Sequence, residues 1–184
     1  MKTKYILHGG SAQKINSQND DFFKEILKNT PNSIKILLVH FASDSAMDDT
    51  NHKADSNQFI RVCGSKKLIF KEASEFKFVN QAKWAEVIYF GGGETSKLLA
   101  VLKKFSNLKK LFEGKIIAGE SAGANSLSAY CYSQSSRGIL KGLALLPTKT
   151  ICHYEDKYKE SFGKNYKNLE TLFLPIYQFK VFKI

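Results

Sequence analysis

The stretch that decides the fold is Lys115-Ile116-Ile117-Ala118-Gly119-Glu120-Ser121-Ala122-Gly123. An apolar run typical of a strand leads into a serine that has a glycine two residues before it and two after, and a helix-compatible segment follows. Flanking side chains would collide in so tight a turn, so the glycines leave the Ser121 hydroxyl exposed above the sheet. The amide of Ala122 then faces the same space and is a candidate oxyanion donor. The stretch predicts a nucleophile elbow, with a chance five-residue match as the alternative.

Around this elbow, apolar runs alternate with amphipathic segments, a pattern that predicts an α/β fold with a mostly parallel sheet. The sequence has no linker, repeat or low-complexity tract, so we expect one domain over residues 1–184. The expected strands cover residues 5–7, 34–39, 68–70, 86–90, 115–118, 149–152, 172–174 and 179–182. The expected helices open at Ser17 or Asn19, span 48–62, open at Glu94 or Thr95, and span the polar segment 157–169, while 142–147 is expected to be a loop.

A second glycine cluster, Phe90-Gly91-Gly92-Gly93-Glu94-Thr95, also lies between a predicted strand and a predicted helix. Consecutive glycines allow backbone N–H groups to approach an anion closely, and a helix N-terminus adds a favourable dipole. Gly92 and Gly93 are therefore candidates for an oxyanion hole shared with Ala122. A plain tight turn is the structural alternative. A phosphate-binding loop is poorly supported, because neither Gly-Lys-Ser/Thr nor the GxGxxG spacing is present.

The chain has four histidines that are candidates for the general base, His8, His40, His52 and His153. His153 is the one that follows Ser121 in the sequence, and it stands at the expected carboxyl end of a strand, the edge where ligands of open α/β sheets gather. His8 also ends a strand beside glycines and is the second candidate. His40 reads as a buried strand-end residue and His52 as a surface residue.

Composition argues for a folded, reduced protein. The apolar fraction of 43% indicates a globule, and no apolar run is long enough for a membrane span or a signal peptide. The cysteines Cys63, Cys131 and Cys152 have no metal or disulfide spacing, which favours a cytoplasmic location. The net charge of +11 suggests nucleic-acid binding, but Arg61 and Arg137 are the only arginines among 28 basic residues. Scattered lysines on solvated helix faces are the simpler interpretation.

Three motifs in this order resemble the dipeptidase E and cyanophycinase family of serine peptidases: 88–95 with Leu98-Leu99, 119–125, and 142–147 followed by Cys152-His153-Tyr154. The opening 7–10 and the strand 36–42 are also similar, so the resemblance covers nearly the whole chain. It implies a class I glutamine amidotransferase-like fold, a three-layer sandwich around a mostly parallel sheet. It also implies Ser121 as nucleophile, His153 as general base, and the amides of Gly92 or Gly93 and Ala122 as oxyanion hole. The implied reaction is cleavage of small peptides next to an acidic residue, without metal or cofactor.

The sequence departs from this family in the acid that orients the histidine. That acid is expected some fifteen residues after the serine or just after a late Leu-Pro, yet the two regions read Ser133-Gln134-Ser135-Ser136-Arg137 and Leu174-Pro175-Ile176-Tyr177. Glu120, beside the nucleophile, and Glu155, after the histidine, are the candidates for an orienting or tuning acid. Either the role is filled from elsewhere or the enzyme is slow, because loss of the acid can cost about 10⁴ in turnover.

The leading hypothesis is a cytoplasmic serine peptidase that acts through an acyl-enzyme on small, acidic, Asp-containing peptides. The alternative is a catalytically weak or inactive binding protein with the same fold, and a nucleic-acid-associated protein is a third hypothesis that rests on charge alone. The expected partner is a small peptide substrate, with neither nucleic acid nor membrane. The assembly state is left open, with a homodimer as one form.

Overall fold

The computed structural model of the chain describes residues 2–44, 48–164 and 166–184. Within these residues, six strands form one sheet in the order β10-β1-β5-β4-β2-β3. The five strands β1, β5, β4, β2 and β3 pair in parallel with their neighbours in this order, and β10 pairs antiparallel with β1. The bounds are β1 (Lys4–His8), β2 (Ser33–Val39), β3 (Lys67–Glu72), β4 (Val87–Phe90), β5 (Ile116–Glu120) and β10 (Phe179–Lys183). The predicted α/β class with a mostly parallel central sheet is confirmed.

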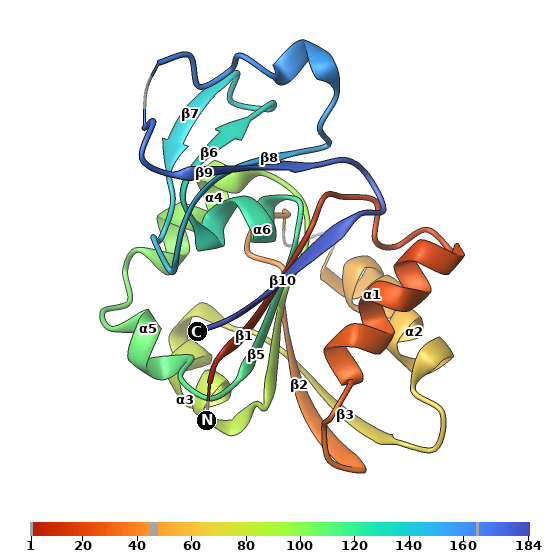
Figure 1. Cartoon of the computed structure of the whole chain (residues 1–184). Coiled ribbons are helices and arrows are strands. Elements are labelled where there is room, and N and C mark those ends of the chain that lie inside the picture. Colours follow the sequence, from red (N-terminus) through yellow and green to blue (C-terminus); the bar gives the residue numbers. More distant parts are fainter. Residues whose placement is uncertain (1, 45–47, 165) are drawn as a thin grey trace.

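Helices cover both faces of this sheet, as Figure 1 shows. On one face, α1 (Ser17–Leu27) and α2 (Asp48–Val62) pack on a core that includes Phe22, Phe23 and Phe59. The cap of α1 is Asn16, whose side chain accepts a hydrogen bond from the Asn19 amide, so the predicted cap at Ser17 or Asn19 was wrong by one to three residues. Apolar side chains of α1 recur at helical spacing, and their burial stabilises the helix against the sheet.

The opposite face carries α3 (Phe78–Trp84), α4 (Thr95–Leu102), α5 (Leu108–Leu111) and α6 (Ala122–Leu127), with a short 3₁₀ turn η2 (Glu75–Lys77) before α3. Their buried residues form a second core that includes Phe78, Leu98, Leu102 and Phe112. The sheet therefore lies between two helical layers, which is the predicted three-layer sandwich.

A second sheet extends the molecule above α4 and α6 (Figure 1). Its order is β7-β6-β8-β9, with β6 (Ser128–Ser133), β7 (Gly138–Lys141), β8 (Leu146–Cys152) and β9 (Glu170–Leu174). The sequence predicted the end of β8 and most of β9 but missed β6 and β7. β7 has only four residues, and β6 contains no Val, Ile, Leu or Phe, so neither resembles the aliphatic runs of the strands that were predicted.

The predicted helix over 157–169 was wrong. After a 3₁₀ turn η3 (Asp156–Tyr158), the described residues of this segment form turns, and Asn165 lies outside the described residues. Among the described residues of this segment, Phe162 is the one that is buried. One buried side chain does not supply the apolar face that a surface helix needs to offset its nucleation cost.

Candidate active site

The elbow at Ser121 joins β5 directly to α6. Ser121 has φ 50° and ψ −104°, a conformation that L-residues rarely adopt. The flanking glycines are required by contact: a Cβ on Gly119 would lie 2.5 Å from the Gly123 carbonyl carbon, and one on Gly123 would lie 2.2 Å from the Phe90 carbonyl oxygen. The turn is therefore held tight by backbone packing, and it presents the Ser121 side chain at the carboxyl end of the central sheet.

His153 comes from the other sheet, one residue after β8 ends at Cys152. Its Nε2 lies 2.8 Å from Ser121 Oγ, within hydrogen-bond distance. The backbone of His153 is left-handed, with φ 49°, and its amide donates to the Gly9 carbonyl at 2.8 Å. Burial holds the pKa of the His153 imidazole below its ordinary value. The structure thus brings together the two side chains that the sequence singled out, although they are 32 positions apart.

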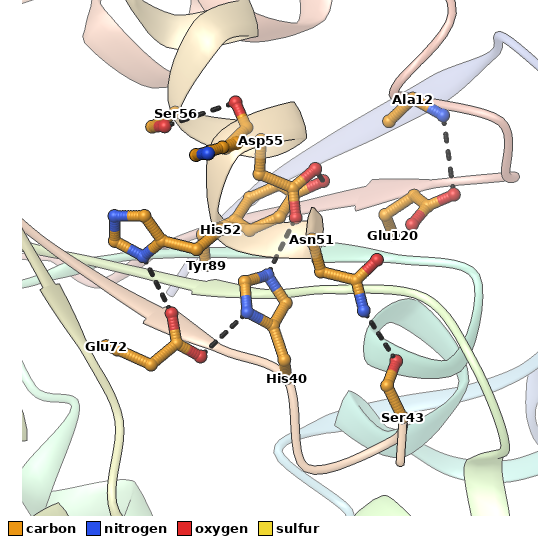
Figure 2. Close-up of polar contacts among 11 residues, drawn as sticks. Ala12, His40, Ser43, Asn51, His52, Asp55, Ser56, Glu72, Tyr89 and Glu120 are labelled. Carbon is orange, nitrogen blue, oxygen red and sulfur yellow. Dashed lines mark hydrogen bonds and ion pairs between the residues drawn. The ribbon is translucent and has the colours of Figure 1, made fainter. Parts of the chain in front are cut away.

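The other three histidines are engaged elsewhere. His8 is fully buried: its Nε2 lies 3.0 Å from Asn19 Oδ1, and its Nδ1 accepts from the Gly10 amide at 3.1 Å. Burial lowers the pKa of His8 to about 4. His40 is bonded through both ring nitrogens, to Asp55 and Glu72, and His52 is bonded to Glu72 (Figure 2). With both ring nitrogens of His8 and of His40 engaged, neither imidazole is free to accept a proton from a nucleophile.

Some amides of the glycine loop after β4 donate backbone hydrogen bonds to neighbouring segments. Gly91 N–H donates to the Val39 carbonyl at 3.0 Å, and Glu94 N–H donates to the Ala42 carbonyl at 2.8 Å. Gly93 has φ 130°, and a Cβ there would lie 2.5 Å from the Ala42 oxygen. Within the described part of the chain, the Gly93 amide donates no backbone hydrogen bond. The amide of Ala122 opens α6, so it has no partner inside that helix.

Glu120, the last residue of β5, turns its carboxyl group toward the glycine loop. Ala12 N–H donates to its Oε1 at 3.3 Å, and the amides of Ser11 and Gly92 also lie against the carboxyl group. A Cβ on Gly92 would lie 2.5 Å from Glu120 Oε2. Burial, together with the nearby Asp55, raises the pKa of Glu120 to about 7. Of the two loop amides proposed as oxyanion donors, that of Gly92 therefore faces Glu120.

The surroundings of His153 differ from those of a Ser-His-Asp triad. Among the described residues, no carboxylate forms a hydrogen bond with the imidazole. Glu155 is exposed and forms an ion pair with Lys157 at 2.8 Å. The side-chain amide of Gln134 donates to the backbone carbonyls of Cys152 and His153, at 3.2 and 3.1 Å. Gln134 was not predicted as a site residue, because a carboxylate was expected in this loop; its long amide side chain was the available signal.

In the parts of the chain that the structure describes, no three or more His, Cys, Asp or Glu side chains are arranged to hold a metal ion. Across the same residues, no helix combines the length and apolar character needed to cross a membrane.

The chain matches a known protein family and several solved structures. The model of peptidase family S51 matches residues 5–175. No curated protein matches the chain. Among solved structures, a putative peptidase E protein from Listeria monocytogenes EGD-e superposes with a TM-score of 0.66 and 19% identity over 100% of both chains. A peptidase from an acI-B1 Actinobacterium superposes with a TM-score of 0.64 and 20% identity, over 91% of this chain and 75% of that one.

The two structural likenesses show the fold, and the family model, which spans most of the chain, shows the family. The chain belongs to peptidase family S51, the dipeptidase E family of serine peptidases.

Proposed function

We propose that Ser121 and His153 are the catalytic pair of this serine peptidase. The observation that carries the proposal is the 2.8 Å approach of His153 Nε2 to Ser121 Oγ. A serine hydroxyl becomes a useful nucleophile when an adjacent base removes its proton. In this proposal Ser121 Oγ attacks the peptide carbonyl carbon while its proton moves to His153. The imidazolium then protonates the leaving amine, and water hydrolyses the acyl-enzyme.

The environment of His153 suits a general base. Because burial lowers its pKa, the imidazole is neutral at pH 7 and has a free lone pair for the serine proton. The His153–Gly9 backbone bond and the Gln134 contacts to the two carbonyls fix the strained backbone that carries the ring. We propose that these backbone contacts orient the imidazole in place of an acid.

The oxyanion hole in this proposal is formed by the amides of Ala122 and Gly93. Ala122 follows Ser121 at the elbow, and Gly93 lies on the glycine loop after β4. Among the described residues, neither amide donates a backbone hydrogen bond. Gly92 then shapes the site: its missing side chain leaves room for the Glu120 carboxyl group.

The proposed substrates are small peptides, with an acidic, Asp-containing peptide as the expectation that follows from the family resemblance. The net charge of +11 supports this preference through long-range attraction of anionic substrates. The charges nearest the elbow act in the opposite direction, because Glu120 is the residue before Ser121. A panel of Asp-Ala, Glu-Ala, Ala-Ala and Lys-Ala dipeptides therefore tests the side-chain preference independently of the catalytic pair.

A fluorophosphonate probe tests the pair itself. We expect covalent labelling of Ser121 in the wild type, no labelling in Ser121→Ala, and labelling slowed by at least about a thousandfold in His153→Ala. Ser126→Ala is a matched control, because Ser126 lies in the same helix and its hydroxyl donates to the Gly123 carbonyl. Full peptide hydrolysis by Ser121→Ala would contradict the proposal.

A weak or inactive binding protein is the second candidate, and one observation favours it: no carboxylate among the described residues contacts His153. Such a protein would bind a dipeptide without hydrolysing it. Turnover that disappears in Ser121→Ala would exclude this candidate, whereas dipeptide binding in both proteins with no turnover in either would favour it.

A further inference from the structure

Glu120 ends β5, the strand that lies between β1 and β4 in the central sheet. Its backbone is in register with His8, the last residue of β1. The loops that follow β1 and β4 therefore flank Glu120 on its two sides. Each loop carries a part of the proposed site. Gly10, against which the His153 ring packs, follows β1, and Gly93, a proposed oxyanion donor, follows β4.

On the β1 side, the carboxyl group of Glu120 faces the amides of two consecutive residues. Ala12 N–H donates to Glu120 Oε1 at 3.3 Å (Figure 2), and the Ser11 amide acts on the same carboxyl group as a hydrogen-bond donor. Ser11 has a left-handed φ of 63° and follows Gly10, whose φ is 133°. Consecutive amides in such a turn form a concave surface that binds an anion. The carboxyl group therefore helps to fix the turn against which His153 packs.

On the β4 side, the same carboxyl group contacts the glycine loop. The Gly92 amide acts on it as a hydrogen-bond donor, and a Cβ on Gly92 would lie 2.5 Å from Glu120 Oε2. Gly91 and Glu94 are anchored through their own amides to backbone carbonyls at and just beyond the end of β2. Gly92 and Gly93 lie between these two anchors. Glu120 is therefore the side chain that holds the middle of the loop, next to the free amide of Gly93.

The protein buries this carboxyl group without pairing it with a cation. Glu120 is 7% exposed, and the ion pairs among the described residues do not include it. Burial, together with the charge of Asp55, raises the pKa of Glu120 to about 7. Burying an ionisable group in this way costs stability. A perturbed carboxyl group that contacts two loops beside a nucleophile is more typical of a functional site than of packing.

We propose that Glu120 is a positioning residue that holds the turn after β1 and the glycine loop after β4 in place around Ser121. Its carboxyl group accepts hydrogen bonds from both loops and so fixes the base and the oxyanion donor relative to each other. It does not contact the substrate. The roles of His153 and Gly93 in this inference rest on the function proposed above, whereas the hydrogen bonds of Glu120 are testable without catalysis.

Amide hydrogen exchange, followed by NMR, tests whether Glu120 holds the two loops. In Glu120→Ala we expect the amides of Ala12 and Gly92 to exchange about tenfold or more faster than in the wild type, because both lose a hydrogen-bond acceptor. The amide of Gly91 is the internal control, since its acceptor is the Val39 carbonyl. Exchange that is unchanged at either Ala12 or Gly92 overturns the proposal.

Fluorophosphonate labelling tests whether these hydrogen bonds matter for Ser121, because the phosphoryl oxygen of the probe needs the same donors as a peptide oxyanion. We expect the rate constant to fall about a hundredfold in Glu120→Ala, with the labelled fraction at the end point equal to that of the wild type. A folding defect alone would lower that fraction and leave the rate constant of the folded molecules unchanged. A wild-type rate constant in folded Glu120→Ala overturns the proposal.

Glu86→Ala is the matched control. Glu86 also accepts a hydrogen bond from a backbone amide, that of Lys35 at 2.8 Å, but it stands just before β4, at the end of the strand opposite to the glycine loop. We expect the wild-type rate constant of labelling in this variant. A rate reduced as much as in Glu120→Ala would show that loss of any such carboxylate slows the site, which overturns a specific role for Glu120.

Glu120→Gln keeps an acceptor oxygen and loses the charge. Because hydrogen bonds to a charged acceptor are the stronger ones, we expect a labelling rate constant about tenfold below that of the wild type and clearly above that of Glu120→Ala. A rate no higher than in Glu120→Ala overturns the proposal, since an acceptor at this position would then not restore the loops. If Glu120→Ala does not fold, Glu120→Gln is compared with the wild type alone, and wild-type exchange or a wild-type labelling rate in it overturns the proposal.

The two measurements separate this inference from the catalytic pair. Labelling of Ser121 in the wild type that is unaffected by Glu120→Ala refutes the positioning role alone. A wild-type protein that is not labelled refutes the catalytic pair, and the exchange rates of Ala12 and Gly92 then decide whether Glu120 holds the loops.

Discussion

Gly10 leaves open the space that the His153 ring occupies, since a Cβ built on Gly10 would lie 2.2 Å from Cε1 and 2.5 Å from Nε2 of the imidazole. Gly10 also has a φ of 133°, a backbone angle that residues other than glycine rarely adopt. The proposed base is therefore held in position by a backbone surface as well as by hydrogen bonds.

Gly10→Ala should displace the His153 ring and slow fluorophosphonate labelling of Ser121 by about a hundredfold, because a displacement of about 1 Å in a catalytic group has effects of that size. Gly138→Ala is the matched control: its Cβ would meet only the Ser136 carbonyl, at 3.7 Å. Labelling rates of the two variants and the wild type provide the comparison. Equal labelling rates in Gly10→Ala and Gly138→Ala would contradict the prediction, because they would show that the His153 ring accommodates the added Cβ without a loss of labelling rate.

Gln134→Ala removes two hydrogen bonds, to the carbonyls of Cys152 and His153. We expect labelling of Ser121 to slow by about tenfold and the free energy of unfolding to fall by about 1 kcal/mol. Ser135→Ala, in the same loop and exposed, should change neither quantity beyond the usual small effect of a surface substitution. Urea unfolding and labelling kinetics measure the two effects separately.

The labelling rate should follow the protonation of His153. Its pKa is lowered by burial, and the neutral imidazole is the active form, so the rate should fall with decreasing pH around a midpoint below 6.5, the ordinary histidine value. Burial and the nearby Asp55 raise the pKa of Glu120 to about 7, so its protonation overlaps this profile. The same measurement in Glu120→Gln isolates the histidine limb. A midpoint above 6.5 in that variant would assign the titration to some group other than a desolvated His153.

Stability should decline between pH 6.5 and 9 because of His40. Its folded-state pKa is raised from 6.5 to about 9, so the folded protein retains a proton that the unfolded chain has released across this window. The stabilisation is complete below pH 6.5 and is lost by pH 9, on the order of 3 kcal/mol at most by linkage. Urea unfolding at a series of pH values measures the decline. Asp55→Asn removes one of the two carboxylate partners of His40 and should flatten it.

Ser121→Gly should be more stable than Ser121→Ala by about 1 kcal/mol, because glycine accepts the positive φ at this position without steric cost. Both variants lack the hydroxyl, so both should be unlabelled. Thermal or urea unfolding of the pair isolates the backbone strain at the elbow. The reverse order of stability would show that the turn is not strained in the folded state.

Sequence patterns predicted the parts of this protein that local chemistry determines. The turn at Ser121 needs glycines on both sides, and β2 ends in four consecutive buried apolar residues, 36–39, so each was evident from the residues. His153 was favoured because it follows Ser121 and ends a strand, and the structure places it beside Ser121. The roles of these residues, and those of Gly92, Gly93, Ala122 and Glu155, remain predictions.

What the sequence did not predict depends on contacts between distant segments. Gln134 lies on a loop between two short strands, and its bonds to the carbonyls of Cys152 and His153 follow from strand pairing that no local pattern indicates. The contact of Glu120 with Gly92 arises because β5 and β4 are neighbours in the sheet. The segment 157–169 contains polar residues that are compatible with a helix, but its described residues have no apolar face to bury, so the predicted helix does not form.

Ser121 follows a strand of the central sheet and His153 follows a strand of the second sheet. The proposed pair therefore exists only while the two sheets keep their relative position. A few contacts span that junction near the site, among them the His153 amide with the Gly9 carbonyl and Cys152 Sγ with the Ser121 carbonyl. Heating that loosens these contacts would separate hydroxyl from imidazole while both sheets remain folded. Loss of activity should therefore come at a lower temperature than loss of secondary structure, and cooling should restore it.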